Sequence, residues 1–220
     1  MSSKSNKIYK YSQLIFDFDG VLVESNEIRF EGFQILFNSF PVDKVERLVK
    51  YARLNGGMSR YEKIRYFFED ILNEPVTNDD VNALSKKYSE IVKEKVIKAK
   101  AVTGSLEFLA ANNSKCLFAI VSGSDQEELR EVCKARGINN YFIKMLGSPV
   151  SKEKNISRLL GELGWEKGSC LYIGDSINDF EAAQNNNIDF LARGSGLVDW
   201  DFVDNVTVIR DLTQLQLYIT

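Results

Sequence analysis

The 220-residue chain contains no histidine and only three cysteines, and these absences exclude several kinds of active site. Without an imidazole there is no Ser-His-Asp or Cys-His nucleophile system and no zinc site with a histidine ligand. Carboxylates, lysines and hydroxyls remain for catalysis, together with any metal ion that carboxylates hold. Cys116, Cys133 and Cys170 are odd in number and widely separated, so we expect reduced core thiols rather than disulfides or a metal site.

Long apolar segments and an excess of basic residues are also missing. No segment approaches the roughly 18 consecutive apolar residues that cross a bilayer, and residues 1–10 lack the apolar run of a signal peptide. The net charge of -3 does not supply the concentrated Lys and Arg that a nucleic acid or an anionic membrane requires. We therefore expect a cytoplasmic protein that binds neither nucleic acid nor membrane. No motif specifies its oligomeric state.

Short apolar segments recur along the chain, each followed by a turn rich in Gly, Ser, Asp or Asn. The segments are residues 14–16, 116–121, 170–173, 190–192 and 206–209, and helical patterns follow several of them, for example at 126–135. Continuous apolar strands that alternate with helices predict a doubly wound, Rossmann-like α/β fold with a parallel sheet covered on both faces. In such a sheet, ligands bind beyond the carboxyl ends of the strands.

Residues 25–99 show a different pattern, with no strand-like segment and with successive amphipathic helices such as 60–72 and 79–98. One interpretation is that these helices merely pack on the sheet. A single crossover between two strands needs far fewer residues, so an inserted all-helical domain is the favoured interpretation. The expected domains are an α/β core formed by residues 1–24 and 100–220 and a helical domain at 25–99.

Acidic turns follow two of the expected strands. Asp17 and Asp19 come directly after the first strand, and Asp175 and Asp179 follow the strand at 170–173. Close carboxylates repel one another unless a cation or a shared proton relieves them, so adjacent strands would create a site for a hard cation such as Mg²⁺. Either turn alone could be an Asx-turn or a helix N-cap. Their coincidence favours the metal site.

Two weaker signals accompany the acidic turns. Ser122 follows the strand at 116–121, and its hydroxyl, with the backbone N–H groups of Gly123 and Ser124 at an expected helix start, could hold an anion. A serine in this place is more often only a cap. Lys152 opens another expected helix, where a lone lysine is most often a solvated surface charge.

Together these segments resemble the four signature motifs of the haloacid dehalogenase superfamily. The motifs are Asp17-Phe18-Asp19-Gly20-Val21-Leu22, Ile120-Val121-Ser122-Gly123, Ser148-Pro149 through Lys152, and Gly174-Asp175 through Asp179. The first and fourth motifs are specific to the superfamily, whereas the second and third indicate it only when the first and fourth are also present. The resemblance covers nearly the whole chain, with the helical insert in the place of that superfamily's cap domain. It is strongest to the phosphoglycolate phosphatase and β-phosphoglucomutase branch.

The resemblance implies a phosphatase that depends on Mg²⁺ and hydrolyses a small phosphorylated metabolite through an aspartyl-phosphate intermediate. Asp17 would be the nucleophile, and Asp19 the general acid and then the general base. Mg²⁺ would be held by Asp17, Asp175 and the backbone carbonyl of Asp19, with Asp179 as a ligand or as support for the ligands.

The second and third motifs would bind the substrate. The resemblance implies that Ser122 and Lys152 bind the transferring phosphoryl oxygens, next to the backbone N–H of Gly123. Lys152 would also offset the negative charge of Asp17. A dehalogenase is disfavoured, because dehalogenases of this superfamily lack the second aspartate of the first motif, which is Asp19 here.

A β-phosphoglucomutase-like sugar phosphomutase is the closest alternative function. Gly57-Met58-Ser59-Arg60 resembles the segment of that branch whose arginine holds a second substrate phosphate. Arg60 would then bind a phosphate or a carboxylate, with Lys63 and Arg65 nearby, or it is only a surface residue at a helix start. Against the mutase, Arg29 stands where that branch usually carries a histidine, and Glu24 replaces an aspartate. Arg29 would then influence which substrate is bound.

Two further alternatives have less support. A non-catalytic, phosphate-binding member of the superfamily would be expected to have lost its nucleophile, yet Asp17 is present. A phosphatase that processes nucleic acid would need a basic patch and aromatic side chains that stack on bases. The aromatic residues Tyr61, Tyr66, Phe67 and Phe68 fall at helical spacing and are more typical of packing.

Overall fold

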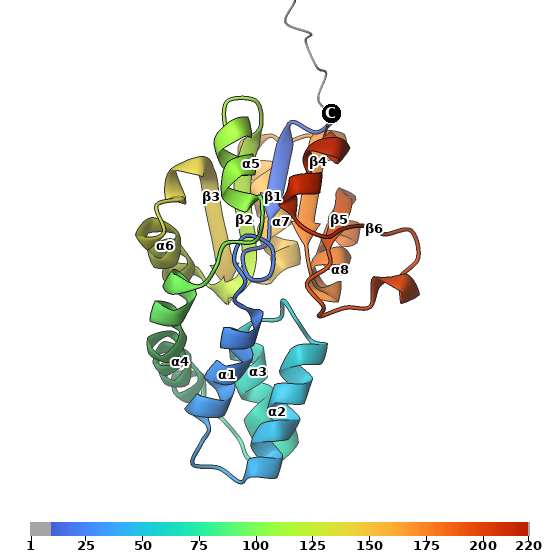
Figure 1. Ribbon diagram of the computed structural model, residues 1–220. Helices are drawn as coiled ribbons and strands as arrows, with labels where there is room; N and C mark the ends of the chain where they lie inside the picture. Colours follow the sequence, from blue (N-terminus) through green and yellow to red (C-terminus); the bar gives the residue numbers. More distant parts are fainter. Residues whose placement is uncertain (1–9, 220) are drawn as a thin grey trace, which may run out of the picture.

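A computed structural model describes residues 10–219 and contains one six-stranded parallel sheet (Figure 1). The strand order is β3-β2-β1-β4-β5-β6, so β1 lies between β2 and β4. The strands are β1 (Gln13–Phe16), β2 (Leu117–Asp125), β3 (Phe142–Ser148), β4 (Cys170–Gly174), β5 (Asp189–Arg193) and β6 (Thr207–Ile209). Because β1 pairs with both β2 and β4, the three predicted motifs at their carboxyl ends meet at one edge of the sheet.

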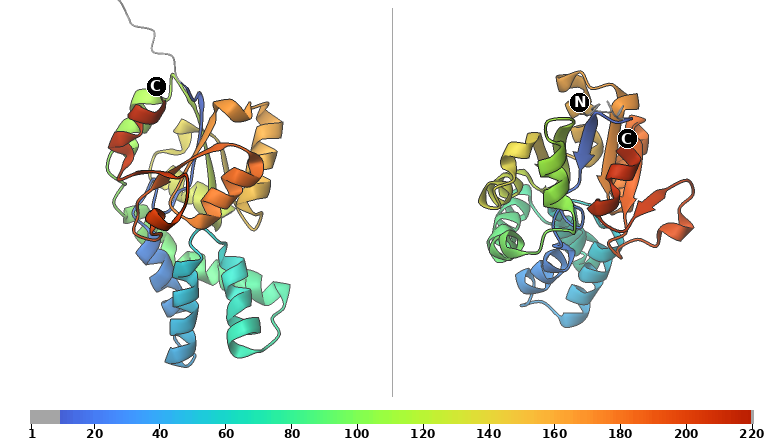
Figure 2. Two further views of the ribbon diagram at one scale, coloured as in Figure 1. Left: turned by 90° about the vertical axis from the view of Figure 1, so that its right-hand side faces the viewer. Right: turned by 45° about the horizontal axis from the view of Figure 1, so that its top comes forward.

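Helices cover both faces of this sheet (Figure 2). One face packs against α5 (Ser105–Asn112), α6 (Gln126–Ala135) and α9 (Gln216–Ile219), and the other against α7 (Lys152–Leu163) and α8 (Ile177–Asn186). Leu14 and Phe16 contribute to the first layer and Ile15 to the second. Since both faces are buried, the strands are continuous apolar segments, and the predicted doubly wound α/β fold is confirmed.

The helices of residues 26–98, between β1 and α5, lie beyond the carboxyl end of β1 (Figure 1). They are α1 (Asn26–Leu36), α2 (Val42–Leu54), α3 (Arg60–Tyr66), a π-helix at Phe67–Leu72 that continues α3, and α4 (Asn78–Lys98). Ser59 and Thr77 cap α3 and α4, each with a capping box. Phe30 and Phe33 of α1 belong to the same apolar cluster as Phe16 of the sheet, so apolar packing continues from the sheet into these helices.

The strand β3 is not among those predicted from the sequence. It pairs only with β2 at one edge of the sheet, where Ile143 is exposed and Lys144 is half-buried. These side chains interrupt the apolar segment that marks the other strands. Within residues 10–219, no helix is long and apolar enough to cross a bilayer. The prediction that the chain begins without a signal peptide concerns mainly residues 1–9, which lie outside the described residues.

Candidate active site

The turn after β1 brings the first acidic motif against the fourth. Asp17 donates its backbone N–H to the Ile173 carbonyl at 2.9 Å, which ties the turn to β4. Gly20 has a φ of +72°, and a Cβ there would lie 2.0 Å from a carboxylate oxygen of Asp175. Only glycine allows both this backbone conformation and this close approach.

Three buried carboxylates form the centre of the site. Asp17, Asp175 and Asp179 each present an oxygen, and these atoms lie within 4.8 Å of one another. Burial raises the pKa of Asp17 to about 8; the Lys152 ammonium opposes this increase, and Asp179 and Asp175 add to it. Burial and the charge of Asp179 raise the pKa of Asp175 to about 7. This excess of negative charge, carried by oxygen donors, fits a divalent cation such as Mg²⁺.

Asp179 differs from the other two carboxylates because protein donors occupy both of its oxygens. Its Oδ1 accepts hydrogen bonds from Lys152 Nζ and from the Tyr172 hydroxyl, each at 2.5 Å. Its Oδ2 accepts from the Ser176 hydroxyl at 2.5 Å. Lys152 Nζ also donates to Asp17 Oδ2 at 3.0 Å. This geometry favours Asp179 as the residue that positions Lys152 beside Asp17, rather than as a metal ligand.

Ser122 and Gly123 reach the same cavity from the end of β2. The predicted helix at 126–135 is confirmed as α6, but the expectation that Gly123 and Ser124 lie at its start is wrong, because β2 continues to Asp125. The Asp125 carboxylate caps α6 by accepting hydrogen bonds from two backbone N–H groups of its first turn, at 3.0 and 3.1 Å. Ser122 Oγ instead accepts a hydrogen bond from the Ser124 N–H at 3.2 Å.

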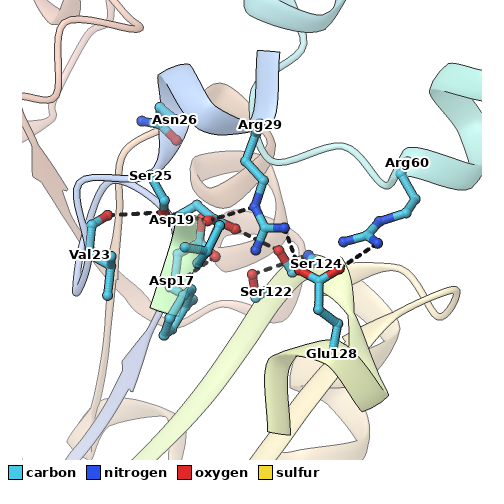
Figure 3. Close-up of polar contacts among 12 residues, drawn as sticks. Asp17, Asp19, Val23, Ser25, Asn26, Arg29, Arg60, Ser122, Ser124 and Glu128 are labelled. Atoms are coloured by element: carbon cyan, nitrogen blue, oxygen red, sulfur yellow. Dashed lines mark hydrogen bonds and ion pairs between the residues drawn. The ribbon is translucent and has the colours of Figure 1, made fainter. Parts of the chain in front are cut away.

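Ser25 and Arg29, at the start of α1, and Ser124 of β2 hold the Asp19 carboxylate (Figure 3). Its Oδ1 accepts hydrogen bonds from the Ser25 hydroxyl at 2.5 Å and from Arg29 Nε at 2.9 Å. Its Oδ2 accepts from the Ser124 hydroxyl at 2.6 Å. Burial raises the pKa of Asp19, but Arg29 and the two serines outweigh it and hold this pKa below its ordinary value. The side chain of Asp19 is thus fully engaged by the protein.

Glu128 of α6, which the sequence gives no reason to single out, joins the two predicted substrate-binding arginines (Figure 3). One of its carboxylate oxygens accepts from Arg29 Nη1, and the other accepts from Arg60 Nη1 at 2.7 Å. Arg60 Nη1 also donates to Ser89 at 2.5 Å, and its guanidinium lies 4.6 Å from the ring centre of Tyr88. An acidic residue in the first turn of a helix ordinarily serves the helix dipole, so its sequence position gives no sign of this network.

The segment between α2 and α3 lies directly on the site. A Cβ on Gly123 would lie 2.2 Å from the carbonyl oxygen of Gly57. Gly57 has a φ of +78°, and a Cβ there would lie 2.4 Å from the Ser176 hydroxyl and 2.8 Å from Lys152 Nζ. The backbone of Gly57, from the helices of residues 26–98, therefore contacts Gly123 of the second motif and lies beside Lys152 of the third.

This contact predicts a large effect of Gly123→Ala. The new methyl group would push the Gly57 backbone away, and we expect a loss of about 1–3 kcal/mol in the free energy of unfolding, as for other overpacked sites. Urea denaturation measures this loss. The matched control is Gly161→Ala in α7, where nothing lies within 4 Å of the added Cβ. There we expect a gain of roughly 0.5–1 kcal/mol from helix propensity. Equal effects of the two substitutions would contradict the close approach.

The cavity between the sheet and these helices has an empty volume of about 530 Å³, counting its open mouth. Most of the predicted site residues line it: Asp17, Asp19, Arg29, Arg60, Ser122, Gly123 and Asp175. Lys152 and Asp179 lie behind Asp17, in contact with it or with each other.

Comparison with known proteins identifies the family. The haloacid dehalogenase-like hydrolase family matches residues 14–193. The chain belongs to this family. Pyrophosphatase PpaX of Listeria monocytogenes is 26% identical over 185 residues, which cover 80% of each chain. Phosphoglycolate phosphatase of Synechococcus elongatus is 23% identical over 199 residues, covering 89% of this chain and 87% of that protein.

Solved structures of haloacid dehalogenase-like hydrolases share the fold. The magnesium-bound hydrolase YfnB of Bacillus subtilis superimposes with a TM-score of 0.68 at 16% identity, covering 95% of this chain and 99% of that one. The family predicted from the four motifs is confirmed, and the protein is an enzyme of the hydrolase class.

Proposed function

We propose that this haloacid dehalogenase-like hydrolase is an Mg²⁺-dependent phosphatase that hydrolyses a small phosphorylated metabolite through an aspartyl-phosphate. The observation that carries this proposal is the buried Asp17, whose carboxylate contacts Lys152 and lies within 4.8 Å of Asp175. A carboxylate beside a fixed cation and a metal site can attack an anionic phosphoryl group without prohibitive repulsion. The activities named for the Listeria and Synechococcus relatives support the substrate class.

The reaction takes two steps on the residues of this chain. In the first, an oxygen of Asp17 forms a bond to phosphorus while the bond to the leaving oxygen breaks, and Asp19 in its protonated form gives its proton to that oxygen. This role requires Asp19 to leave the hydrogen bonds from Arg29 and the two serines, which favour its ionised form in this structure. In the second, Asp19 takes a proton from water as the water oxygen bonds to phosphorus. The bond to Asp17 then breaks and inorganic phosphate leaves. Ser122, the Gly123 N–H and Lys152 bind the phosphoryl oxygens in both steps.

The metal site of the proposal uses oxygen atoms at the ends of β1 and β4. Asp17, Asp175 and the backbone carbonyl of Asp19 would hold Mg²⁺, with Asp179 in support through Lys152. When bound, the ion supplies positive charge that offsets the repulsion between Asp17 and the phosphoryl group. The magnesium-bound YfnB structure supports this assignment at the level of the fold.

We assign residues 25–99 as the cap domain of the enzyme, with residues 1–24 and 100–220 as its core. Arg29, Gly57 and Arg60 of this segment all contact core residues at the cavity. A cap in this place closes the cavity and excludes water that would compete for the phosphoryl group.

The experiment that tests the proposed function measures phosphate release from a panel of phosphorylated metabolites with Mg²⁺ and with EDTA. The panel spans sugar phosphates, phosphoglycolate, pyrophosphate and nucleoside monophosphates. We expect release from at least one of them, abolished by EDTA. No release from any member, together with isomerisation of β-glucose 1-phosphate, would favour the phosphomutase instead.

The raised pKa values of Asp17 and Asp175 predict how Mg²⁺ binding depends on pH. Their unfolded pKa is about 3.9, so the stability they contribute is complete below that value. It is lost as the pH rises through about 7 to 8, where the folded groups ionise. Mg²⁺ binds the ionised form. We therefore expect the Mg²⁺-induced increase in Tm to be larger near pH 8.5 than near pH 6.

A thermal unfolding series with and without Mg²⁺ at both pH values measures this difference. Asp175→Asn is the control that removes one proposed ligand, and it should abolish most of the increase. An equal Mg²⁺ effect at the two pH values would contradict the assigned site.

A further inference from the structure

The side-chain amide of Asn26 joins the first helix of residues 26–98 to the fourth motif. Asn26 is the first residue of α1, beside Ser25 (Figure 3), and its Nδ2 donates a hydrogen bond to Asp175 Oδ2 at 2.7 Å. The two residues are 149 positions apart, so the contact forms only when α1 lies at the carboxyl end of β4. Asn26 lines the cavity, yet the proposed reaction gives it no task.

The turn between β1 and α1 is built to allow this contact. A Cβ on Gly20 would lie 2.0 Å from Asp175 Oδ2 and 2.3 Å from Asn26 Nδ2, the same two atoms that form the hydrogen bond. Arg193, the last residue of β5, donates to the Gly20 carbonyl oxygen at 3.1 Å and pairs with the Glu24 carboxylate. Both ends of the turn are therefore fixed to β5, and the turn brings Asn26 to Asp175.

Asn26 is the direct link between these helices and the carboxylate cluster of Asp17, Asp175 and Asp179. In the part of the chain that the structure describes, no other side chain of residues 26–98 hydrogen-bonds to these three carboxylates. Ser195, which follows β5, is a second hydrogen-bonding partner of Asp175. Asp175 is thus oriented from the sheet and, through Asn26, from α1.

A donor that hydrogen-bonds to a ligating carboxylate fixes the direction in which that carboxylate presents its oxygens. Such partners are as much part of a metal site as the ligands, and their loss typically reduces metal affinity about 10- to 100-fold. The first turn of α1 also holds Asp19, whose side chain accepts from the Ser25 hydroxyl and from Arg29 Nε. The start of α1 therefore contacts two of the residues that the proposal places around Mg²⁺.

We propose that Asn26 is a positioning residue of the metal site, and that it links occupancy of this site by Mg²⁺ to the stability of α1. Its amide holds Asp175 in the orientation that accepts the ion. Coupling between two equilibria is reciprocal, so the bound ion in turn holds the start of α1 against the sheet. This inference rests on the proposed function, because it concerns the Mg²⁺ site of the phosphatase.

The first test is a calorimetric titration of the full-length protein with Mg²⁺ alone, at about pH 8.5. We expect Asn26→Ala to raise the Kd for Mg²⁺ about 10- to 100-fold. The matched control is Asn38→Ala, which removes an exposed asparagine just beyond the other end of α1 and should leave the Kd unchanged. Thermal unfolding without Mg²⁺ checks that both variants fold.

The second test is hydrogen exchange of the wild-type protein with and without Mg²⁺, which needs no variant. We expect Mg²⁺ to slow the exchange of the α1 amides more than that of residues 212–219, which include α9. In Asn26→Ala, saturating Mg²⁺ should no longer slow the exchange of α1 beyond that of residues 212–219, because the link between Asp175 and α1 is missing.

The Mg²⁺ dependence of phosphate release separates positioning from a general structural defect. For Asn26→Ala we expect the Mg²⁺ concentration that gives half the maximal rate to rise about 10- to 100-fold. Saturating Mg²⁺ should restore most of kcat, since the residues that contact the phosphoryl group are intact. A structural defect would lower kcat at every Mg²⁺ concentration.

Two results would overturn this inference while leaving the phosphatase intact. One is an unchanged Kd for Mg²⁺ in Asn26→Ala, and the other is a wild-type protein that binds Mg²⁺ without any added protection of α1. A wild-type protein that neither binds Mg²⁺ nor releases phosphate would instead overturn the proposed function, and the inference with it.

Discussion

Asp17→Asn is expected to reduce kcat by at least about 10⁴-fold, because an amide oxygen cannot attack phosphorus as a carboxylate does. Asn is nearly isosteric with Asp and keeps an acceptor for the Phe18 N–H, which donates to Asp17 Oδ1 at 2.7 Å. The fold should therefore persist. Phosphate release on the best substrate of the panel, measured beside a circular dichroism spectrum, checks both parts.

The stability of Asp17→Asn provides an independent readout. The folded pKa of Asp17 is raised to about 8, so without a bound metal Asp17 lowers the stability of the fold progressively as the pH rises from about 4 to 8. A neutral Asn removes that penalty, and the metal-free variant should have a Tm no lower than that of the wild type at about pH 8. Asp201→Asn, at an exposed position, is the matched control and should leave activity unchanged. Retained turnover in Asp17→Asn would refute the nucleophile.

The position of the acidic site can be predicted from the sequence because its cause is local. Leu14, Ile15 and Phe16 form an apolar strand that is buried on both faces, and the first polar side chain after it, Asp17, has to lie at the sheet edge. The same reasoning places Asp175 after β4. The sequence does not show whether β1 and β4 are neighbours in the sheet. The structure shows that they are, because Phe16 of β1 pairs in parallel with Ile173 of β4.

The parts that the sequence does not predict depend on contacts between distant segments. Glu128 is 99 residues from Arg29 and 68 from Arg60, so no local pattern connects them. The start of α6 at Gln126 is predicted correctly, but the sequence does not identify Asp125 as its cap. From the sequence, either Ser122 or Asp125 could cap the helix. In the structure β2 extends beside β3 as far as the pairing of Asp125 with Ser148, so Asp125 is the residue that caps α6.

These contacts divide the charged residues of the site into two groups with different tasks. Lys152 of α7 and Asp179 of α8 fix the charge around Asp17, where the proposed chemistry takes place. Arg29 and Arg60 come from the helices of residues 25–99, and both form ion pairs with Glu128 of α6. The second group therefore links the helices that line the cavity to α6. Loss of these ion pairs with Glu128 should therefore lower the stability of the fold as well as affect substrate binding.

Glu128→Gln is expected to reduce the free energy of unfolding by about 3–5 kcal/mol, because it leaves two buried guanidinium groups without their shared counter-charge. The Glu128 side chain is 1% exposed, and those of Arg60 and Arg29 are 4% and 11% exposed, so water compensates little of the loss. Urea denaturation at pH 7 measures it. The matched control is Glu127→Gln on the same helix, whose pair with Arg130 is exposed and should contribute less than about 1 kcal/mol.

The pH dependence of this loss identifies its cause. The two arginines overcome the effect of burial and hold the pKa of Glu128 well below its usual range, so its contribution is complete above its unfolded pKa of about 4.3. The contribution is lost as the pH falls below that value toward the folded pKa. The difference in stability between wild type and Glu128→Gln should therefore be constant from about pH 6 to 8 and shrink below about pH 4. A difference that does not change with pH would show that packing, rather than charge, makes Glu128 important, and the link between α6 and the helices of residues 25–99 would then not depend on its ionised carboxylate.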